Sequence, residues 1–460
     1  MNKLEIRSLL GLIALYATRM LGLFMVLPVL SLYVSEYSGS TTFLLGVALG
    51  IYGLTQGLLQ IPLGMLSDRI GRKAVILGGM GLFLLGSLVA ALADSMAGLI
   101  VGRALQGAGA VASTIMALLS DLTTEENRTK AMAAVGGSIG ISFALAMVLG
   151  PVLASFGGLQ LIFWITALLA ALGILVVLWI PSPQTTSRLA TSEALTMPAL
   201  FKATLKNTEL LRLDLGVCVL HMVQMASWVS IPFILRERLG FGLEQHWWLY
   251  LLTMGLGFVV MLPLVIVGER RRRLKPVFVA AILLLAVAEA LFFRFQASLA
   301  LFAFAMFLFF TAFNLLEATL PSLVSKITPG GSRGTAMGIY SSSQFLGAFL
   351  GGVAGGYIAH NFGYQYVFLF SALAGLVWAG VAFTMPNPRH WGTVVIDLAS
   401  HPHVPADGAA VRRLLRGVEE VTCILDRELI YLKVDKDRFD KRQLEALLRD
   451  TGMTGGRTSG

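Results

Sequence analysis

Charged residues and cysteines are both scarce in this chain. Asp, Glu, Lys and Arg make up 13% of its 460 residues, against about 25% in a typical soluble domain. Hydrophobic residues make up 56%, and the mean hydropathy is +0.78. This composition excludes an ordinary soluble protein and indicates a polytopic membrane protein. Cys218 and Cys423 lie far apart in the sequence, so they predict neither a disulfide framework nor a metal site.

Several functional signatures are absent as well. The chain has no glycine-rich phosphate-binding loop of the P-loop type, which argues against ATP as the energy source. No catalytic constellation stands out, so we do not expect an enzyme. The segment after Trp391 has no Cys-x-x-Cys pair and hence no thiolate metal site. We therefore expect no metal and no cofactor.

Long apolar runs are the dominant positive feature. Each is about 20 residues long, enough to cross roughly 30 Å of hydrocarbon. They predict an all-α polytopic membrane protein with twelve transmembrane helices in two six-helix halves, residues 1–180 and 213–388, joined by a Pro/Ser/Thr-containing cytoplasmic linker at 181–212. The predicted spans are 9–34, 44–66, 74–93, 96–119, 131–154, 159–180, 213–235, 247–267, 274–293, 299–324, 335–358 and 364–385.

The basic residues lie in loops between these runs. The net charge of +9 therefore indicates contact with anionic lipid rather than with nucleic acid. Basic and non-basic loops alternate, which predicts that both termini are cytoplasmic in a multi-pass protein of the bacterial inner membrane. The basic loops lie near Arg69, Arg128, Lys202, Arg270 to Arg273, and Arg333. The loop with Arg236 and Arg238 is a partial exception.

The segment Gly64 to Lys73, GMLSDRIGRK, separates the second and third apolar runs. Its spacing, Gly-x-Leu-x-Asp-Arg-x-Gly-Arg-Lys, resembles the signature loop between helices 2 and 3 of the major facilitator superfamily. The resemblance implies a transporter that works by alternating access, with a substrate site at midplane between two related halves. It also implies a cytoplasmic gate formed by Gly64, Asp68, Arg69, Gly71, Arg72, Lys73 and Asp121.

Two contacts are expected within this gate. Asp68 is placed to meet the positive N-terminal end of the helix that begins near Gly334 and Thr335. Such a contact is worth about 0.3–1 kcal/mol when exposed and up to about 2 when partly buried. The resemblance implies that it stabilises the outward-open state. Asp121 is expected to pair with Arg72. The alternative is that both acids are merely solvated capping residues.

Two further segments resemble motifs of the same family. Arg103-Ala-Leu-Gln-Gly107-Ala-Gly109 is similar to its helix 4 motif, in which the arginine is linked to proton coupling. Gly150-Pro151 resembles its antiporter motif in helix 5. The pattern's other glycines are replaced here by Ala146, Ala154 and Ser155, which weakens the assignment to antiport but keeps close packing possible.

The few polar or ionisable residues inside apolar runs are functional candidates, because charge in a membrane is costly. His221 and Glu317 lie at similar depths, roughly 15 Å from the cytoplasmic end of their helices. We expect Glu317 to carry the coupling proton and His221 to modulate it. Glu289 is the next candidate, with snorkelling towards the periplasmic surface as its alternative. Arg19 and Asn314 are predicted to line the substrate cavity.

From Trp391 the composition becomes that of a soluble domain. Strands are predicted at Thr393–Leu398, Val421–Leu425 and Leu429–Val434, and helices at Gly408–Arg416 and Phe439–Arg449. This β-α-β-β-α order over residues 391–450 resembles a small α+β ferredoxin-like module. No final strand is visible, because residues 451–460 are rich in Gly and Thr and are expected to be disordered.

Taken together, these features predict a proton-driven secondary transporter of the drug-efflux branch. We expect it to exchange small lipophilic compounds for protons. The expected partners are a small-molecule substrate, protons and the lipid bilayer, and the chain is expected to be a monomer. An uptake symporter on the same fold is the nearest alternative. A membrane receptor whose tail senses a cytoplasmic ligand is an alternative of another class, but such a protein has no need of an intact gate segment.

Overall fold

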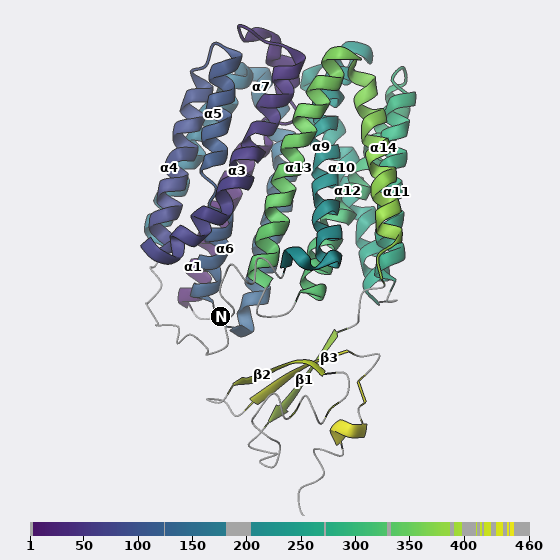
Figure 1. Ribbon diagram of the computed structural model, residues 1–460. Coiled ribbons are helices and arrows are strands. Elements are labelled where there is room, and N and C mark those ends of the chain that lie inside the picture. The colour runs from purple at the N-terminus through teal and green to yellow at the C-terminus, as the bar shows by residue number, and fades with distance from the viewer. Residues whose placement is uncertain are drawn as a thin grey trace, which may run out of the picture.

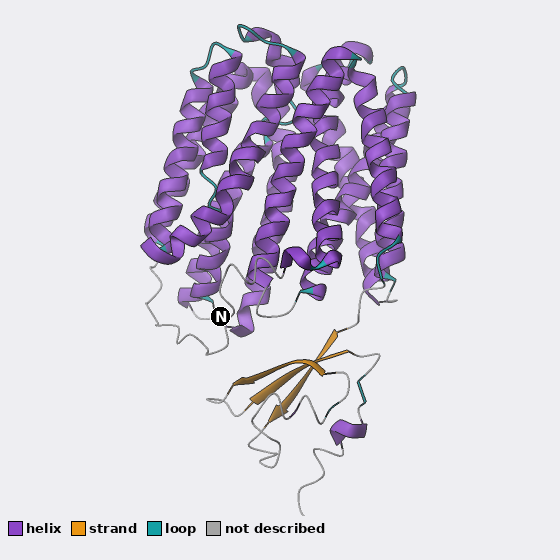
Figure 2. Ribbon diagram, viewed as in Figure 1, coloured by secondary structure: helices purple, strands orange, loops and turns teal. Residues whose placement is uncertain are grey.

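The computed structural model describes residues 3–123, 125–180, 204–270, 273–328, 333–386, 391–397, 411, 415, 418–424, 429–435, 439–440 and 442–445. A bundle of long helices makes up most of the protein (Figure 1). A three-stranded sheet lies beyond one end of the bundle, the end at which the N-terminus also lies (Figure 2).

The helices of the first half begin with α1 (Lys3–Phe24) and the short α2 (Leu30–Tyr33). They continue with α3 (Thr42–Ile70), α4 (Arg72–Ala91), α5 (Met96–Ala108), α6 (Ala112–Leu122) and α7 (Glu125–Trp179). The second half consists of α9 (Thr208–Phe233), α10 (Leu243–Arg270), α11 (Leu274–Arg294), α12 (Leu299–Ile327), α13 (Arg333–Asn361) and α14 (Tyr364–Phe383).

Ten segments within the described ranges are long and apolar enough to cross a membrane. The one in α7 contains two non-helical residues, Gly157 and Gly158, where two helices join. Helix α13 has 29 residues and lies outside these ten, because glycine, serine and other small or polar residues lower its hydropathy. The spans are therefore readable from composition except where small residues replace large apolar ones.

The connection between α3 and α4 is shorter than the sequence indicates. The apolar pattern predicts a loop from Gly64 to Lys73, but α3 continues to Ile70 and α4 begins at Arg72. Gly71 alone joins them, with φ +99°, a conformation that glycine adopts without the steric cost of a Cβ. The predicted loop was wrong in extent, because the polar residues Asp68 and Arg69 continue the helix where it reaches its hydrated end.

Two other predicted helices are interrupted. The predicted helix at 96–119 breaks between α5 and α6, where a Cβ on Gly109 would lie only 2.3 Å from the Gly79 carbonyl oxygen. The two backbones are thus in direct contact, and the chain leaves the helix at this point.

The predicted helix at 9–34 ends at Phe24, and a turn containing Pro28 leads into α2. Proline lacks the N–H that an uninterrupted helix needs.

The two halves meet along α3 and α13, where glycines allow the backbones to touch. A Cβ on Gly46 would lie 2.1 Å from the carbonyl oxygen of Gly352, and one on Gly53 would lie 2.5 Å from that of Phe345. Small residues permit such close approach between membrane helices. Farther along, a Cβ on Gly338 would meet nothing within 4 Å, and one on Gly64 would meet only Ser113 of its own half. The halves are therefore in close contact at the end farther from Gly71.

The C-terminal sheet has the strand order β1-β3-β2 with both neighbouring pairs antiparallel. Its strands are β1 (Trp391–Asp397), β2 (Val418–Ile424) and β3 (Leu429–Asp435), close to the predicted positions. They share a separate apolar core that includes Ile396, Val411, Leu415, Leu432 and Val434.

Only residues 411 and 415 of the predicted helix at 408–416 are described. Of the predicted helix at 439–449, residues 439–440 and 442–445 are described, and 442–445 are helical. Two hydrogen bonds of helical spacing fall within them, from the Leu415 N–H to the Val411 carbonyl and from the Leu444 N–H to the Asp440 carbonyl. Most of the predicted linker, residues 181–203, and the predicted disordered tail also lie outside the described residues.

Candidate functional site

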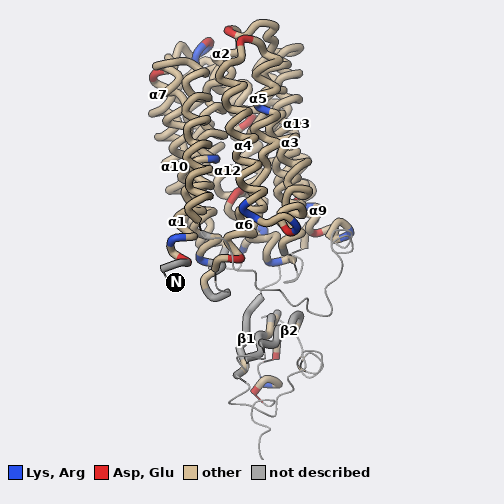
Figure 3. Tube along the Cα trace, turned by 90° about the vertical axis from the view of Figure 1, so that its left-hand side faces the viewer, with Lys and Arg blue, Asp and Glu red and all other residues tan. Residues whose placement is uncertain are grey.

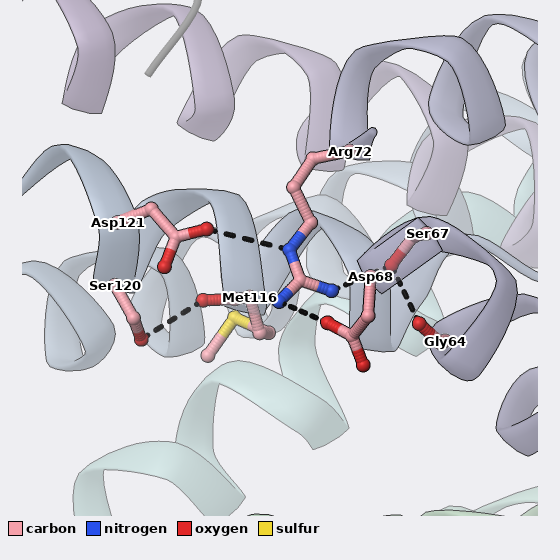
Figure 4. Close-up of polar contacts among 7 residues, drawn as sticks. All are labelled: Gly64, Ser67, Asp68, Arg72, Met116, Ser120 and Asp121. Atoms are coloured by element: carbon pink, nitrogen blue, oxygen red, sulfur yellow. Dashed lines mark hydrogen bonds and ion pairs between the residues drawn. The ribbon is translucent and has the colours of Figure 1, made fainter. Parts of the chain in front are cut away.

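Arg72 joins three helices at the end of the bundle that carries Gly71 (Figure 4). Its Nη2 lies 2.5 Å from Asp68 Oδ1 on α3, and its Nε lies 3.3 Å from Asp121 Oδ2 on α6. Its Nη1 donates a 2.6 Å hydrogen bond to Ser67 Oγ, whose own proton goes to the Gly64 carbonyl. The structure therefore brings together Asp68, Arg72 and Asp121, as the sequence suggests, and adds Ser67.

The other predicted gate residues surround this cluster. Lys73 donates a 2.7 Å hydrogen bond to the carbonyl of Ile180, immediately after the end of α7, where a cation interacts favourably with the helix dipole. Arg69 is exposed. Gly64 lies inside α3, where a Cβ would lie 3.3 Å from Ser113 Oγ on α6. Lys73 thus links this cluster to the end of α7.

The predicted contact of Asp68 with the start of α13 is not formed by the described residues in this conformation. Asp68 pairs with Arg72, and 55% of its side chain is exposed. A Cβ on Gly334 would meet nothing within 4 Å. The contact therefore stays a prediction for a conformation in which the two halves approach at this end.

Charged residues gather at the two ends of the bundle, and few lie between (Figure 3). In the first half, Arg103 is 0% and Arg19 is 1% exposed. Arg103 donates to the Ala48 carbonyl and to Gln106 Oε1, at 3.4 and 2.8 Å. Arg19 donates to the Tyr52 hydroxyl and to Gln56 Oε1, at 3.2 and 2.8 Å. Both predicted residues are therefore enclosed within the first half, and Arg19 does not line an open cavity here.

In the second half, the structure brings His221 and Glu317 together. His221 Nε2 lies 3.7 Å from Glu317 Oε2. Its Nδ1 is 3.1 Å from the Val217 carbonyl, which makes Nδ1 the protonated nitrogen. Nε2 then accepts a 2.8 Å hydrogen bond from Gln344 Nε2, which is also 3.5 Å from Glu317 Oε1. Gln344 on α13 thus bridges a histidine on α9 and a carboxylate on α12.

The surroundings of this pair are polar and partly open. The side chain of Glu317 is 39% exposed, while that of His221 is 10% exposed. Asn314 Nδ2 and the Tyr340 hydroxyl are buried without a hydrogen-bond partner in the described part of the chain. Tyr340 also interacts electrostatically with Glu317 and with Asp214, a buried carboxylate near the start of α9. These groups form a polar region that Glu317 connects to the exterior.

Glu289 occupies a different environment. It is 0% exposed on α11, and its Oε1 accepts a 2.7 Å hydrogen bond from Ser227 Oγ. Oε2 has no partner among the described residues. The predicted snorkelling to the surface is wrong, because the side chain is enclosed within the second half. It has no exposed surface through which to exchange a proton in this conformation.

The helix 5 motif has a packing role here. A Cβ on Gly150 would lie 2.5 Å from the Met25 carbonyl and 3.0 Å from the Pro28 ring. Pro151 follows within α7 and is buried. This motif therefore lets α7 approach the turn between α1 and α2.

Sequence reasoning did not identify Ser67, Gln56, Gln106, Asp214, Tyr340 and Gln344. Most are uncharged residues, which are common inside membrane helices and carry no distinctive spacing. Asp214 was detectable, because it is an ionisable residue two helical turns before His221, at positions that share one helix face. Asp214 was not singled out because it lies close to the start of the predicted span, next to the charged residues of the linker.

The family of the chain follows from comparison with known proteins. A model of the Major Facilitator Superfamily matches residues 12–274 and 213–419. The chain therefore belongs to the Major Facilitator Superfamily, and it is a transporter rather than an enzyme.

Particular relatives narrow this class. The chain is 44% identical over 447 residues to the inner membrane transport protein YajR of Escherichia coli (strain K12), covering 97% of this chain and 98% of that protein. It is 26% identical to multidrug resistance protein MdtH of Aeromonas hydrophila subsp. hydrophila, covering 73% and 83%. A crystal structure of a bacterial homologue of the human lysosomal transporter Spinster, inward-facing and occupied, shares the fold with a TM-score of 0.69 at 15% identity, covering 83% and 97%. The chain is thus a multi-pass bacterial inner membrane transporter.

Proposed function

We propose that this chain is a proton-driven exporter that exchanges small lipophilic compounds for protons. The observation that carries this proposal is the cluster of His221, Glu317 and Gln344. A carboxylate that is partly exposed and held beside a histidine inside the membrane is suited to gain and lose a proton during transport. Arginine is unsuited to this role because it stays protonated.

The class of substrate is inferred from the aromatic residues next to this cluster. The His221 ring lies 5.8 Å from that of Phe313, which lies 6.2 Å from Phe143 of α7; Phe143 lies 5.0 Å from Phe24 of α1. This row crosses from one half to the other. Phe143 and Phe313 are buried in this conformation, and we infer that their flat apolar faces contact a lipophilic compound when the halves move apart. The name of the MdtH relative, a multidrug resistance protein, supports the same class.

We further propose twelve membrane crossings with both termini in the cytoplasm. The count treats α7 as two helices that join at Gly157 and Gly158, treats α5 and α6 as one interrupted crossing, and includes α13. With the end carrying Gly71 in the cytoplasm, the contact between α3 and α13 closes the periplasmic side. The described conformation then corresponds to an inward-open state, in which the gate contact of Asp68 with α13 is released.

The C-terminal segment 391–450 is proposed to be a ferredoxin-like domain. In the split β-α-β arrangement, a right-handed crossover places β1 and β2 parallel with room for one strand between them. The observed order β1-β3-β2 fits this arrangement. The separate apolar core fits a domain that folds beside the membrane part. Residues 1–180 and 213–388 are the proposed transport halves, and the chain is proposed to act as a monomer without metal or cofactor.

The direction of transport is tested by flux. A growth-inhibition screen with an overexpressing strain identifies candidate compounds, and purified protein in proteoliposomes then reports compound and proton movement together. An exporter of the proposed kind moves a compound against its gradient when protons flow in the opposite direction. Movement of both in the same direction would establish an uptake symporter instead. Binding without any flux would favour a receptor.

A further inference from the structure

Arg19 and Arg103 leave several nitrogen atoms without a partner. Nε and Nη1 of Arg19 and Nη2 of Arg103 are buried and make no hydrogen bond, and neither does Nε2 of Gln56, the side chain that accepts from Arg19. All four atoms are donors. They belong to α1, α3 and α5, and both arginines contact the same residue, Tyr52. Arg19 Nη2 is 3.2 Å from its hydroxyl, and the Arg103 guanidinium carbon is 5.2 Å from its ring centre.

The charges of the two guanidinium groups are also unbalanced. Their hydrogen-bond partners are a backbone carbonyl, a hydroxyl and two side-chain amides, all of which are neutral. Neither arginine forms an ion pair with an Asp or Glu among the residues that the structure describes. Water molecules can satisfy the free donors but supply no negative charge. Burying a charge without a counter-charge is strongly unfavourable in the low-dielectric interior of a membrane protein.

We propose that Arg19, Gln56 and Arg103 form a binding site for a small monovalent anion, either a halide or a carboxylate. Because the free atoms are all hydrogen-bond donors, they can bind an anion but not a cation or a metal ion. The anion must be small, because Arg19 and Arg103 are at most 1% exposed. The bound anion balances part of the positive charge that the first half buries.

Binding is tested with purified full-length protein in detergent. The midpoint of thermal unfolding is measured while sodium chloride or sodium formate replaces sodium gluconate at constant ionic strength. A saturable rise of the midpoint with either anion supports the site, and the preference between the two tells whether a halide or a carboxylate occupies it. Equilibrium dialysis with radiolabelled chloride or formate is expected to saturate at a single anion per chain.

Variants separate this site from general salt effects. Arg19→Gln is expected to raise the half-saturating anion concentration at least tenfold. The control Arg294→Gln removes an equal charge from an exposed position at the end of α11. It is expected to leave the half-saturating anion concentration unchanged. Should Arg19→Gln fail to fold, Gln56→Met removes a free donor without altering the charge and is expected to weaken binding severalfold. A wild-type response that never saturates, or an equal response in Arg19→Gln or a folded Gln56→Met, would overturn the proposal.

Discussion

Away from the outermost turns of their helices, the two halves of the bundle bury different kinds of ionisable residue in the described part of the chain. In the first half, the ionisable residues deep inside the described helices are Arg19 and Arg103, held by neutral partners. In the second half, the corresponding residues are His221 and three carboxylates, of which Asp214 and Glu289 are buried and Glu317 is partly exposed. Since arginine does not titrate near neutral pH, this difference fits the proposal that proton exchange takes place in the second half.

The first half contains the cluster of ion pairs around Arg72. Arg72 joins the ends of α3, α4 and α6 through Asp68, Ser67 and Asp121. The corresponding turn of the second half includes residues 271–272, outside the described residues. The proposed transporter combines a proton site in one half with a gate in the other. Under this proposal, protonation affects transport only if the two halves move against each other.

The largest effect is expected from blocking that movement at Gly46. In Gly46→Leu, the Cβ of the new side chain would lie only 2.1 Å from the Gly352 carbonyl oxygen. Overpacking of this kind costs about 1–3 kcal/mol, so Gly46→Leu should disfavour closure at this end by about fivefold to 150-fold. Transport should fall, and cysteines introduced at the two cavity mouths should change their labelling in opposite directions. Gly81→Leu on α4 is the control, because a Cβ there meets nothing within 4 Å. Wild-type labelling in Gly46→Leu would refute this role.

A smaller effect is expected at the gate. Asp68→Asn removes the charge that is proposed to meet the N-terminal end of α13 in the outward-open state. With a contact of about 0.3–2 kcal/mol, the ratio of inward-open to outward-open protein should rise by about twofold to thirtyfold, with lower transport and unchanged insertion. Cysteine labelling of both mouths measures the shift. Glu36→Gln, an exposed acid near the other end, serves as the control. Equal labelling in wild type and Asp68→Asn would count against the gate.

His221 is expected to tune the proton site rather than to carry it. His221 Nε2 lies 3.7 Å from Glu317 Oε2, close enough for the two side chains to interact directly. His221→Ala should therefore shift the midpoint of the pH dependence of transport. Initial transport rates in proteoliposomes across a pH series measure it. An unchanged midpoint would contradict the modulating role.

The smallest effect on transport is expected from removing the C-terminal domain. Its sheet has an apolar core of its own, so truncation after Pro388 should leave a folded membrane part with basal transport and, at most, altered regulation. Size-exclusion chromatography and flux in proteoliposomes test this together. Complete loss of flux in a correctly inserted truncation would show that the domain takes part in the transport cycle.

Length and composition predicted the spans well, because crossing a membrane imposes a nearly fixed length of apolar chain. The sequence predicted the ion pair of Arg72 with Asp121 but not the one with Asp68, and helix counting placed His221 and Glu317 at one level. The helix break at Gly109, the enclosure of Glu289 and the bridging role of Gln344 were not predictable. Each depends on how closely two helices approach, and an individual helix sequence does not specify its neighbours.

Comparison of Glu317 with Glu289 tests the proton site most directly. Both are carboxylates inside the second half, but one is partly exposed beside His221 and the other is enclosed beside Ser227. Glu317→Gln and Glu289→Gln would be reconstituted in proteoliposomes that contain a pH-sensitive dye, with a compound identified by the growth screen. We expect Glu317→Gln to abolish compound-induced proton movement and Glu289→Gln to retain it. Normal coupled antiport by Glu317→Gln across the pH range, with loss in Glu289→Gln, would contradict this assignment and move the proton site to Glu289.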